Sequence, residues 1–269
     1  MAGHTQDIAR WALITGASRG IGRELALGAA RAGLNVIVHS SQLSGTESLL
    51  PLLRDLGVEA VAVAANLADP QAVQKMAAEV ASQHQVDILF NNAGTNDDPT
   101  GSTFTEGDDW RAIPEQYFYT YAVNVLGPAL LVAQFLPQML QRGYGRIINT
   151  TSGILYQPSA YACSKAALDK LTLDFSQRLI GTGVTMNVVD PGWIRTDLGG
   201  AEAPNDVRTV LPGMLVGAFL PDDVTGKWIA AQDFTGMTLA DAISAAPNKL
   251  RNIVATQQQY ESSEDDDSN

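Results

Sequence analysis

Short runs of β-branched and other apolar residues alternate with longer segments of helical pattern along most of this chain. The predicted strands cover residues 11–14, 35–38, 60–63, 86–90, 146–150 and 184–189. The helices predicted between them cover residues 20–31, 44–56, 70–83, 116–141 and 158–180. This rhythm predicts an α/β fold, a doubly wound parallel sheet with helices on both faces. Ligands of such folds bind beyond the carboxyl ends of the strands.

Length and composition favour a single domain. The chain has 269 residues, of which 45% are hydrophobic, enough for one large core. A last sheet strand is expected at 227–230 rather than 236–239, followed by a C-terminal helix over 238–253. We predict one domain over residues 1–258. Acidic residues crowd the last positions, so residues 259–269 are expected to form a solvated, disordered tail.

The charge balance excludes several classes of partner. The net charge is -12, opposite in sign to that of most nucleic-acid-binding proteins. No apolar run reaches 18 residues, so no transmembrane helix is expected, and the polar start does not resemble a signal peptide. The single cysteine, Cys163, fits a reducing compartment. These features predict a cytoplasmic protein without a membrane or nucleic-acid partner.

A glycine-rich turn follows the first predicted strand and enters the first predicted helix. It reads Thr15-Gly16-Ala17-Ser18-Arg19-Gly20-Ile21-Gly22. Glycines allow backbone amides to approach a pyrophosphate, and the positive end of the helix dipole favours its charge. The turn therefore indicates a dinucleotide site at the first strand.

Tyr161 and Lys165 lie four residues apart in a predicted helix, so their side chains share one face. A cation held near a phenol favours the phenolate and lowers the pKa of the phenol from its usual value near ~10. Such a pair can donate or accept a proton. The same spacing is also common on exposed helices, so the pair is either catalytic or an ordinary surface pair. Other motifs must decide between these two interpretations.

Several motifs occur in one order that is highly specific. They are the glycine-rich turn, Asn91-Asn92-Ala93-Gly94, Asn124, Ser152, Tyr161 with Lys165, and Pro191-Gly192. In this respect residues 11–197 resemble the classical short-chain dehydrogenase/reductase family. The resemblance implies a Rossmann fold and an oxidoreductase that transfers a hydride between a nicotinamide cofactor and a carbonyl or secondary alcohol. It implies no metal site.

The resemblance also implies four catalytic roles. Tyr161 is expected to be the general acid in reduction and the base in oxidation. Lys165 is expected to lower the pKa of Tyr161 and to hold the nicotinamide ribose. Ser152 is expected to hydrogen-bond the substrate oxygen. Asn124, within the long predicted helix, is expected to hold a water that connects Lys165 to solvent.

The predicted cofactor is NADP, with NAD less favoured. NAD-binding relatives usually place an acid after the second strand, whereas this chain has His39-Ser40-Ser41 there. Arg19 can meet a 2′-phosphate, although it can also be an ordinary solvent-facing residue. The resemblance places these residues against the cofactor: Gly16, Ser18, Arg19, Gly20, Ile21, Gly22, Ser40, Ser41, Asn66, Leu67, Asn92, Ala93, Gly94, Tyr161, Lys165, Pro191, Gly192, Ile194 and Thr196.

Two segments depart from the family pattern. Ser152 and Tyr161 are nine positions apart, a few fewer than usual. The shortened loop is expected to line the substrate cleft, so the identity of the substrate is not predicted. The stretch over residues 95–113 is longer than usual and is either a lid edge or a surface insertion, with the insertion favoured. Residues 195–220 correspond to a mobile lid, whose apolar side chains suit either a substrate pocket or a subunit contact.

The resemblance further implies a homodimer or homotetramer, paired through the long helix from Gln116 and the Tyr161 helix. Two other functions remain open. One is a 3-oxoacyl thioester reductase, which the acidic surface disfavours because an acyl-carrier protein is itself acidic. The other is a sensor that binds NADP without turnover, which has no need of a complete proton-relay set.

Overall fold

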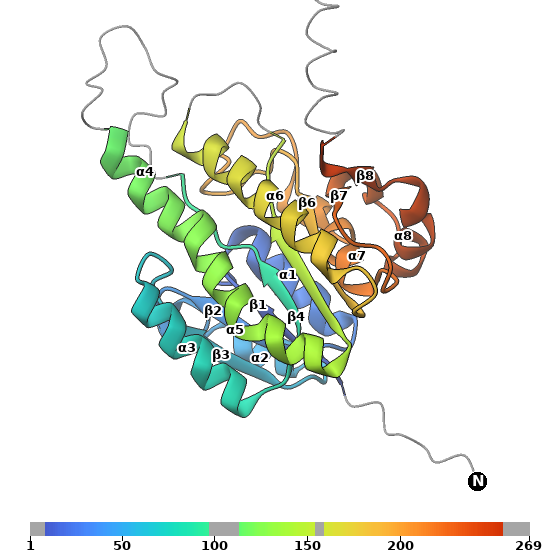
Figure 1. Ribbon diagram of the computed structural model, residues 1–269, viewed down its shortest axis with the longest axis horizontal. Coiled ribbons are helices and arrows are strands. Elements are labelled where there is room, and N and C mark those ends of the chain that lie inside the picture. Colours follow the sequence, from blue (N-terminus) through green and yellow to red (C-terminus); the bar gives the residue numbers. More distant parts are fainter. Residues whose placement is uncertain (1–8, 97–112, 154–158, 255–269) are drawn as a thin grey trace, which may run out of the picture.

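The computed structural model describes residues 9–96, 113–153 and 159–254, in which one eight-stranded sheet lies between two layers of helices (Figure 1). The strand order is β3-β2-β1-β4-β5-β6-β7-β8. Strands β1 to β7 run parallel, and β8 runs antiparallel to β7. This is the predicted doubly wound Rossmann fold. The acidic tail and most of the 95–113 segment lie outside the described residues.

The strands are β1 (Trp11–Ile14), β2 (Asn35–Ser40), β3 (Ala60–Ala64), β4 (Val86–Asn91), β5 (Gly145–Thr150), β6 (Val184–Asp190), β7 (Lys227–Ala230) and β8 (Arg251–Asn252). The α-helices are α1 (Gly20–Arg31), α2 (Leu49–Arg54), α3 (Pro70–Gln83), α4 (Ile113–Tyr121), α5 (Gly127–Arg142), α6 (Ala160–Leu179), α7 (Gly213–Phe219) and α8 (Leu239–Ala245). A π-helical turn, Ala122–Leu126, joins α4 to α5.

Each face of the sheet buries its own apolar core. Side chains alternate along a strand, so Ile14 and Ile148 face the core under α1, α2 and α7, whereas Leu13 and Ile147 face the other. Helices α3, α5 and α6 cover the second face, where α3 and α5 lie side by side (Figure 1). Because both faces are covered, the central strands are buried along their length and mostly apolar, and the few polar side chains within them, such as Asn149 and Asn187, are buried as well.

The helices begin and end where local chemistry requires. The Asp69 carboxylate caps α3 by accepting from the amides of Gln71 and Ala72, and Pro70 fills the first helical position. The Ser159 hydroxyl accepts from the amide of Ala162 and fixes the start of α6, the helix that carries Tyr161 and Lys165. Both catalytic candidates therefore lie within the first two turns of a capped helix.

Some predicted elements were wrong in extent. The predicted helix over 44–56 forms only from Leu49 to Arg54, because Pro51 lacks an amide donor and fits only the first turn of a helix. The predicted C-terminal helix ends at Ala245, two residues before Pro247, and the chain then forms the antiparallel strand β8. The preferred last parallel strand, 227–230, is confirmed as β7.

One helix within the described residues, Tyr117–Arg142, is long and apolar enough by length and composition to cross a membrane. In this fold its inner side packs against the sheet through Leu131, Phe135 and Met139, which are at most 1% exposed. The helix therefore contributes to the core beneath the site described next.

Candidate active site

A cleft of about 690 Å³ lies across the carboxyl ends of the parallel strands. Its lining runs from the glycine-rich turn after β1, past the ends of β2 to β5, to the segment after β6. The residues of the predicted cofactor set that line it are Gly16, Ser18, Arg19, Gly20, Ile21, Gly22, Ser40, Ser41, Asn66, Leu67, Asn92, Ala93, Gly94, Tyr161, Lys165, Pro191 and Thr196. Motifs spread over most of the chain thus meet in one concave surface.

The glycine-rich turn packs so closely that side chains are excluded. Gly16 has a φ of 69°, and a Cβ there would lie 2.8 Å from the Cα of Ala93. A Cβ at Gly22 would lie 2.1 Å from the carbonyl oxygen of Gly16. Only glycine therefore fits at these two positions, and the tight turn brings the start of α1 to the cleft, a position suited to a pyrophosphate.

The Asn91–Gly94 segment supports this turn from below. Asn92 Nδ2 donates to the carbonyl oxygen of Thr15 at 2.9 Å, and the amide of Ala93 donates to Thr15 Oγ1 at 3.0 Å. These contacts connect the ends of β1 and β4, which are neighbours in the sheet. In this structure the segment therefore both lines the cleft and stabilises its floor.

A buried histidine, which the sequence did not single out, joins three strand ends. His39 Nδ1 accepts from the amide of Gly16 at 3.4 Å, and Nε2 lies 3.0 Å from the carbonyl oxygen of Ala65, to which it can donate. Burial lowers the pKa of His39 to about 4, so the imidazole is neutral at pH 7 and can serve both roles. The only sequence signal was its place at the end of β2.

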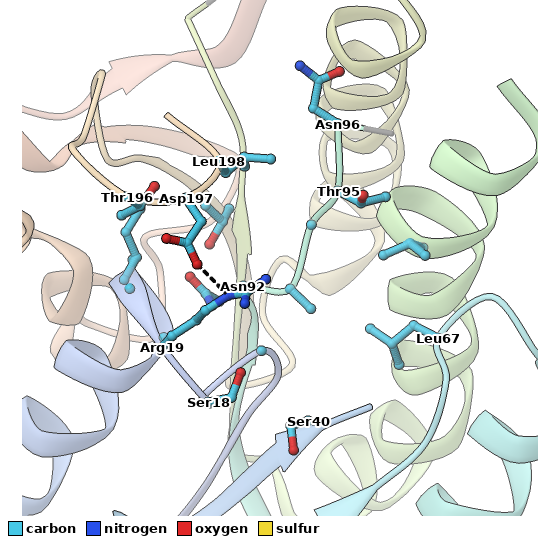
Figure 2. A pocket seen from close by; sticks show the side chains of 18 of the residues that line it. Ser18, Arg19, Ser40, Leu67, Asn92, Thr95, Asn96, Thr196, Asp197 and Leu198 are labelled. Carbon is cyan, nitrogen blue, oxygen red and sulfur yellow. Dashed lines mark ion pairs between the residues drawn. The ribbon is translucent and has the colours of Figure 1, made fainter. Parts of the chain in front are cut away.

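Arg19 lies at the mouth of the cleft, where it forms an ion pair with Asp197. Arg19 Nε is 3.1 Å from Asp197 Oδ2, and the two side chains are 78% and 73% exposed. Figure 2 shows this pair beneath Thr196 and Leu198, with Ser18 and Ser40 below it. Asp197 supplies the only carboxylate among the described residues that line the cleft. The end of β2 thus presents hydroxyl groups where an acid would repel a phosphate.

A loop closes over these hydroxyl groups. A Cβ at Gly45 would lie 3.0 Å from Ser40 Oγ and 3.2 Å from the Cβ of Ser18, so the two serines share one small corner. Ser40 Oγ donates to the carbonyl oxygen of Gln42. The corner holds donors that can be redirected to a ligand at little cost.

Tyr161 and Lys165 lie at the other end of the cleft. Lys165 Nζ donates to the carbonyl oxygen of Thr150 at 2.8 Å and lies 5.5 Å from the centre of the Tyr161 ring. The side chain of Ser152 hydrogen-bonds that of Tyr161. Ser152 itself is not among the residues that line the cleft, but its hydrogen-bond partner Tyr161 is.

The electrostatics of this pair differ from the family expectation. Desolvation raises the pKa of Tyr161 to about 12, and the hydrogen bond from Ser152 only partly offsets it. Burial lowers the pKa of Lys165 to about 8, against the opposing charges of Asp169 and Asp190. The ammonium group donates to the carbonyl oxygen of Thr150, and desolvation sets the direction in which the pKa of the phenol moves.

Asn124 lies in the π-helical turn between α4 and α5 and is fully buried. Its Oδ1 accepts from the amide of Thr95, and its Nδ2 donates to the carbonyl oxygen of Thr95 and to Ser164 Oγ, each at 2.9 Å. A Cβ on Gly94 would lie 3.5 Å from Asn124 Oδ1 and 3.3 Å from Lys165 Nζ. A π turn is often found at functional sites, and here it places Asn124 beside Gly94, which Lys165 Nζ also approaches.

Two predicted cofactor residues lie outside the lining of the cleft. The side chain of Ile194 is 3% exposed and packs in the core, while its backbone bridges Asn205. Gly192 has a φ of 80° and donates its amide to Asp190 Oδ1 at 2.9 Å. Both residues shape the segment after β6, which reaches the cleft through Pro191 and Thr196.

Comparison with known proteins gives consistent results. Residues 10–206 match the model of a family described as short chain dehydrogenase. A short-chain type dehydrogenase/reductase of Picea abies is 35% identical over 254 residues, covering 83% of this chain and 89% of that protein. A 3-oxoacyl-[acyl-carrier-protein] reductase of Staphylococcus epidermidis is 36% identical over 193 residues, covering 70% of this chain and 76% of the relative.

A solved structure gives the same result. It is a metagenomic short-chain oxidoreductase in complex with NADP, with a TM-score of 0.67 and 27% identity. The match covers 82% of this chain and 96% of the other.

Proposed function

The chain belongs to the short chain dehydrogenase family, and we propose that it is an NADP-dependent oxidoreductase acting on a carbonyl or secondary alcohol substrate. The observation that carries this proposal is the continuous lining of one cleft. It joins the glycine-rich turn to Tyr161 and Lys165, and it has Arg19 at the nucleotide mouth and no acid at the end of β2.

The residues present fit a dinucleotide. Only glycine fits at positions 16 and 22, and the close packing there brings the start of α1 to the cleft, where its backbone amides would hold a pyrophosphate. Arg19 with Ser18, Ser40 and Ser41 would hold a 2′-phosphate, which favours NADP over NAD. The NADP bound by the metagenomic oxidoreductase supports this choice. When bound, the cofactor supplies or accepts the hydride.

The chain's own residues would manage the proton. In reduction, the Tyr161 hydroxyl would donate a proton to the substrate oxygen, and Ser152, which hydrogen-bonds Tyr161, would hold that oxygen by a second hydrogen bond. The high pKa of Tyr161 keeps the phenol protonated and able to donate at neutral pH. Lys165 would then return a proton to Tyr161, since its pKa of about 8 allows it to exchange protons near neutrality. Asn124, beside Gly94, would position the water that recharges the lysine.

A 3-oxoacyl thioester is the second candidate substrate. The Staphylococcus epidermidis relative, named as a 3-oxoacyl-[acyl-carrier-protein] reductase, supports it. The net charge of -12 opposes docking of an acidic carrier protein, so we favour a small, unattached carbonyl compound.

We also propose a cytoplasmic homodimer or homotetramer whose catalytic domain spans residues 1–258. Phe118 and Leu126, on the helix that also carries Asn124, are 76% and 53% exposed, and an apolar surface of this kind favours a subunit contact. Sedimentation analysis tests the assembly.

The test of function is a panel of ketones, aldehydes and 3-oxoacyl thioesters with NADPH and with NADH, followed by the absorbance of the reduced nicotinamide. Turnover with NADPH that is lost in Tyr161→Phe supports the proposal. If Tyr161→Phe keeps both cofactor binding and the biological output, the protein is a non-catalytic NADP sensor instead.

A further inference from the structure

Asp190 is a carboxylate among the reacting groups for which the mechanism above has no use. It is the last residue of β6 and directly precedes Pro191. The amide of Thr151 donates to the carbonyl oxygen of Val189 at 2.9 Å, so the end of β5 lies alongside the end of β6 at this point. Asp190 therefore stands between the Ser152 loop and the Pro191-Gly192 turn.

The carboxylate bonds to both of these segments. Asp190 Oδ1 accepts from the amide of Gly192 at 2.9 Å, and the carboxylate also accepts from the amide of Gly153. On the other side of the turn, Gln232 Nε2 donates to the carbonyl oxygen of Pro191 at 2.8 Å. The turn is thus held at two points, and Asp190 is the point that connects it to Ser152.

We propose that Asp190 is a positioning residue for hydride transfer, which fixes Ser152 relative to the Pro191-Gly192 turn and places its negative charge beside the loop whose Ser152 hydrogen-bonds Tyr161. The inference rests on the proposed function. Asp190 and Gln232 together would hold the Pro191-Gly192 turn by hydrogen bonds. Asp190 would in addition act on Tyr161 through its negative charge, which a neutral side chain lacks.

The charges around Asp190 make the electrostatic task specific. Lys165 and Asp169 face the site from α6, and Arg251 faces it from β8, where it is also 2.8 Å from Asp233. Burial raises the pKa of Asp190, whereas the two amides, Arg251 and Lys165 oppose that rise. The charge of Asp190 raises the pKa of both Tyr161 and Lys165, whereas that of Asp169 acts on Lys165. Asp190 is thus the carboxylate that opposes formation of the phenolate.

The test compares Asp190→Asn with the wild-type enzyme. Asparagine carries no charge, so the phenolate becomes easier to form, and its one acceptor oxygen can still hold an amide of the loops. We expect the rising limb of the pH profile for alcohol oxidation to move to lower pH by about half a unit or more, with KM for NADP within about twofold. Asp190→Ser, also neutral, should move it in the same direction. Asp174→Asn is the matched control, because that carboxylate lies on the exposed side of α6 and is 61% exposed.

A second readout does not depend on turnover. Tyrosine labelled with ¹³C reports each phenol by NMR, and Tyr161→Phe identifies the resonance of Tyr161. The titration of that resonance should move to lower pH in Asp190→Asn and stay in place in Asp174→Asn. An unchanged titration, or a loss of kcat in both neutral variants with an unchanged pH profile, would overturn the electrostatic role. If the wild-type protein turns over no carbonyl compound, the proposed function fails while the titration still decides the role of Asp190.

Discussion

At its nucleotide end the cleft is shaped by backbone, whereas at its catalytic end it is shaped by titratable side chains withdrawn from solvent. In the first region no Cβ fits at Gly16 or Gly22, and the neutral His39 fixes the turn by accepting from the amide of Gly16. In the second region Tyr161, Lys165 and Asp190 all have pKa values displaced by desolvation. The glycine turn is compatible with a stable fold, whereas desolvated titratable groups lower the stability of the folded state. Such a cost is expected where a site carries out proton transfer rather than binding alone.

The largest effect should come from the catalytic end. Tyr161→Phe removes the hydroxyl but keeps the ring, so turnover of a ketone with NADPH should fall about a thousandfold or more. The dissociation constant for NADPH should change by less than about threefold, because the amides of the glycine turn are untouched. Steady-state kinetics measure the loss of turnover, and fluorescence titration of NADPH measures the dissociation constant. Equal losses in binding and rate would mean that the two regions are not separable.

Lys165→Met should remove activity and stabilise the fold. One pKa unit is worth about 1.4 kcal/mol, so a fall in the lysine pKa from 10.5 to about 8 corresponds to an upper limit of roughly 3 kcal/mol. Loss of the hydrogen bond to Thr150 offsets part of this, leaving a gain of about 1 kcal/mol or more at pH 7.

The gain in stability from Lys165→Met should depend on pH. A lysine whose pKa is lower when folded costs stability fully below pH 8, and the cost disappears as the pH rises to 10.5. Urea unfolding at both ends of this range should therefore show Lys165→Met gaining only at the lower pH. Lys170→Met is the control, since Lys170 is 68% exposed on the same helix.

At the nucleotide end, Gly16→Ala should weaken NADPH binding by about tenfold or more, because its Cβ would meet the backbone of Ala93. Gly33→Ala separates this clash from backbone strain. Gly33 has a φ of 83° and nothing within 4 Å of its Cβ position, so its change should cost only about 1 kcal/mol of stability. Calorimetric titration of NADPH with both variants tests the comparison, and similar affinities would contradict it.

The smallest effects concern cofactor choice. Arg19→Ala should weaken NADPH binding about tenfold and leave NADH binding nearly unchanged, since one charge-assisted contact to the 2′-phosphate is lost. Asp197→Asn releases Arg19 from a surface ion pair worth less than about 1 kcal/mol and should strengthen NADPH binding about twofold. Equal losses for both cofactors in Arg19→Ala would remove Arg19 from the 2′-phosphate site.

The sequence predicted the elements whose signals are local. Alternating apolar runs predicted the parallel strands, and the glycine turn between β1 and α1 lies at the cleft as expected. The predicted C-terminal helix was too long because Pro247 lacks an amide donor and ends the helix, which the prediction did not take into account. His39 and Asp190 were not predicted, because each acts through partners that the sheet brings together from distant strand ends. The upward shift of the Tyr161 pKa depends on burial, which no spacing reveals.

Hydride transfer within this cleft is measured most directly with NADPH that carries deuterium at the transferable position, mixed with the best ketone of the panel. We expect the alcohol product of the wild-type enzyme to gain one deuterium on the former carbonyl carbon, and Tyr161→Phe to bind the cofactor without forming that product. A protein that binds NADPH but transfers deuterium to no carbonyl compound, or a Tyr161→Phe variant that transfers it as fast as the wild type, would contradict the account.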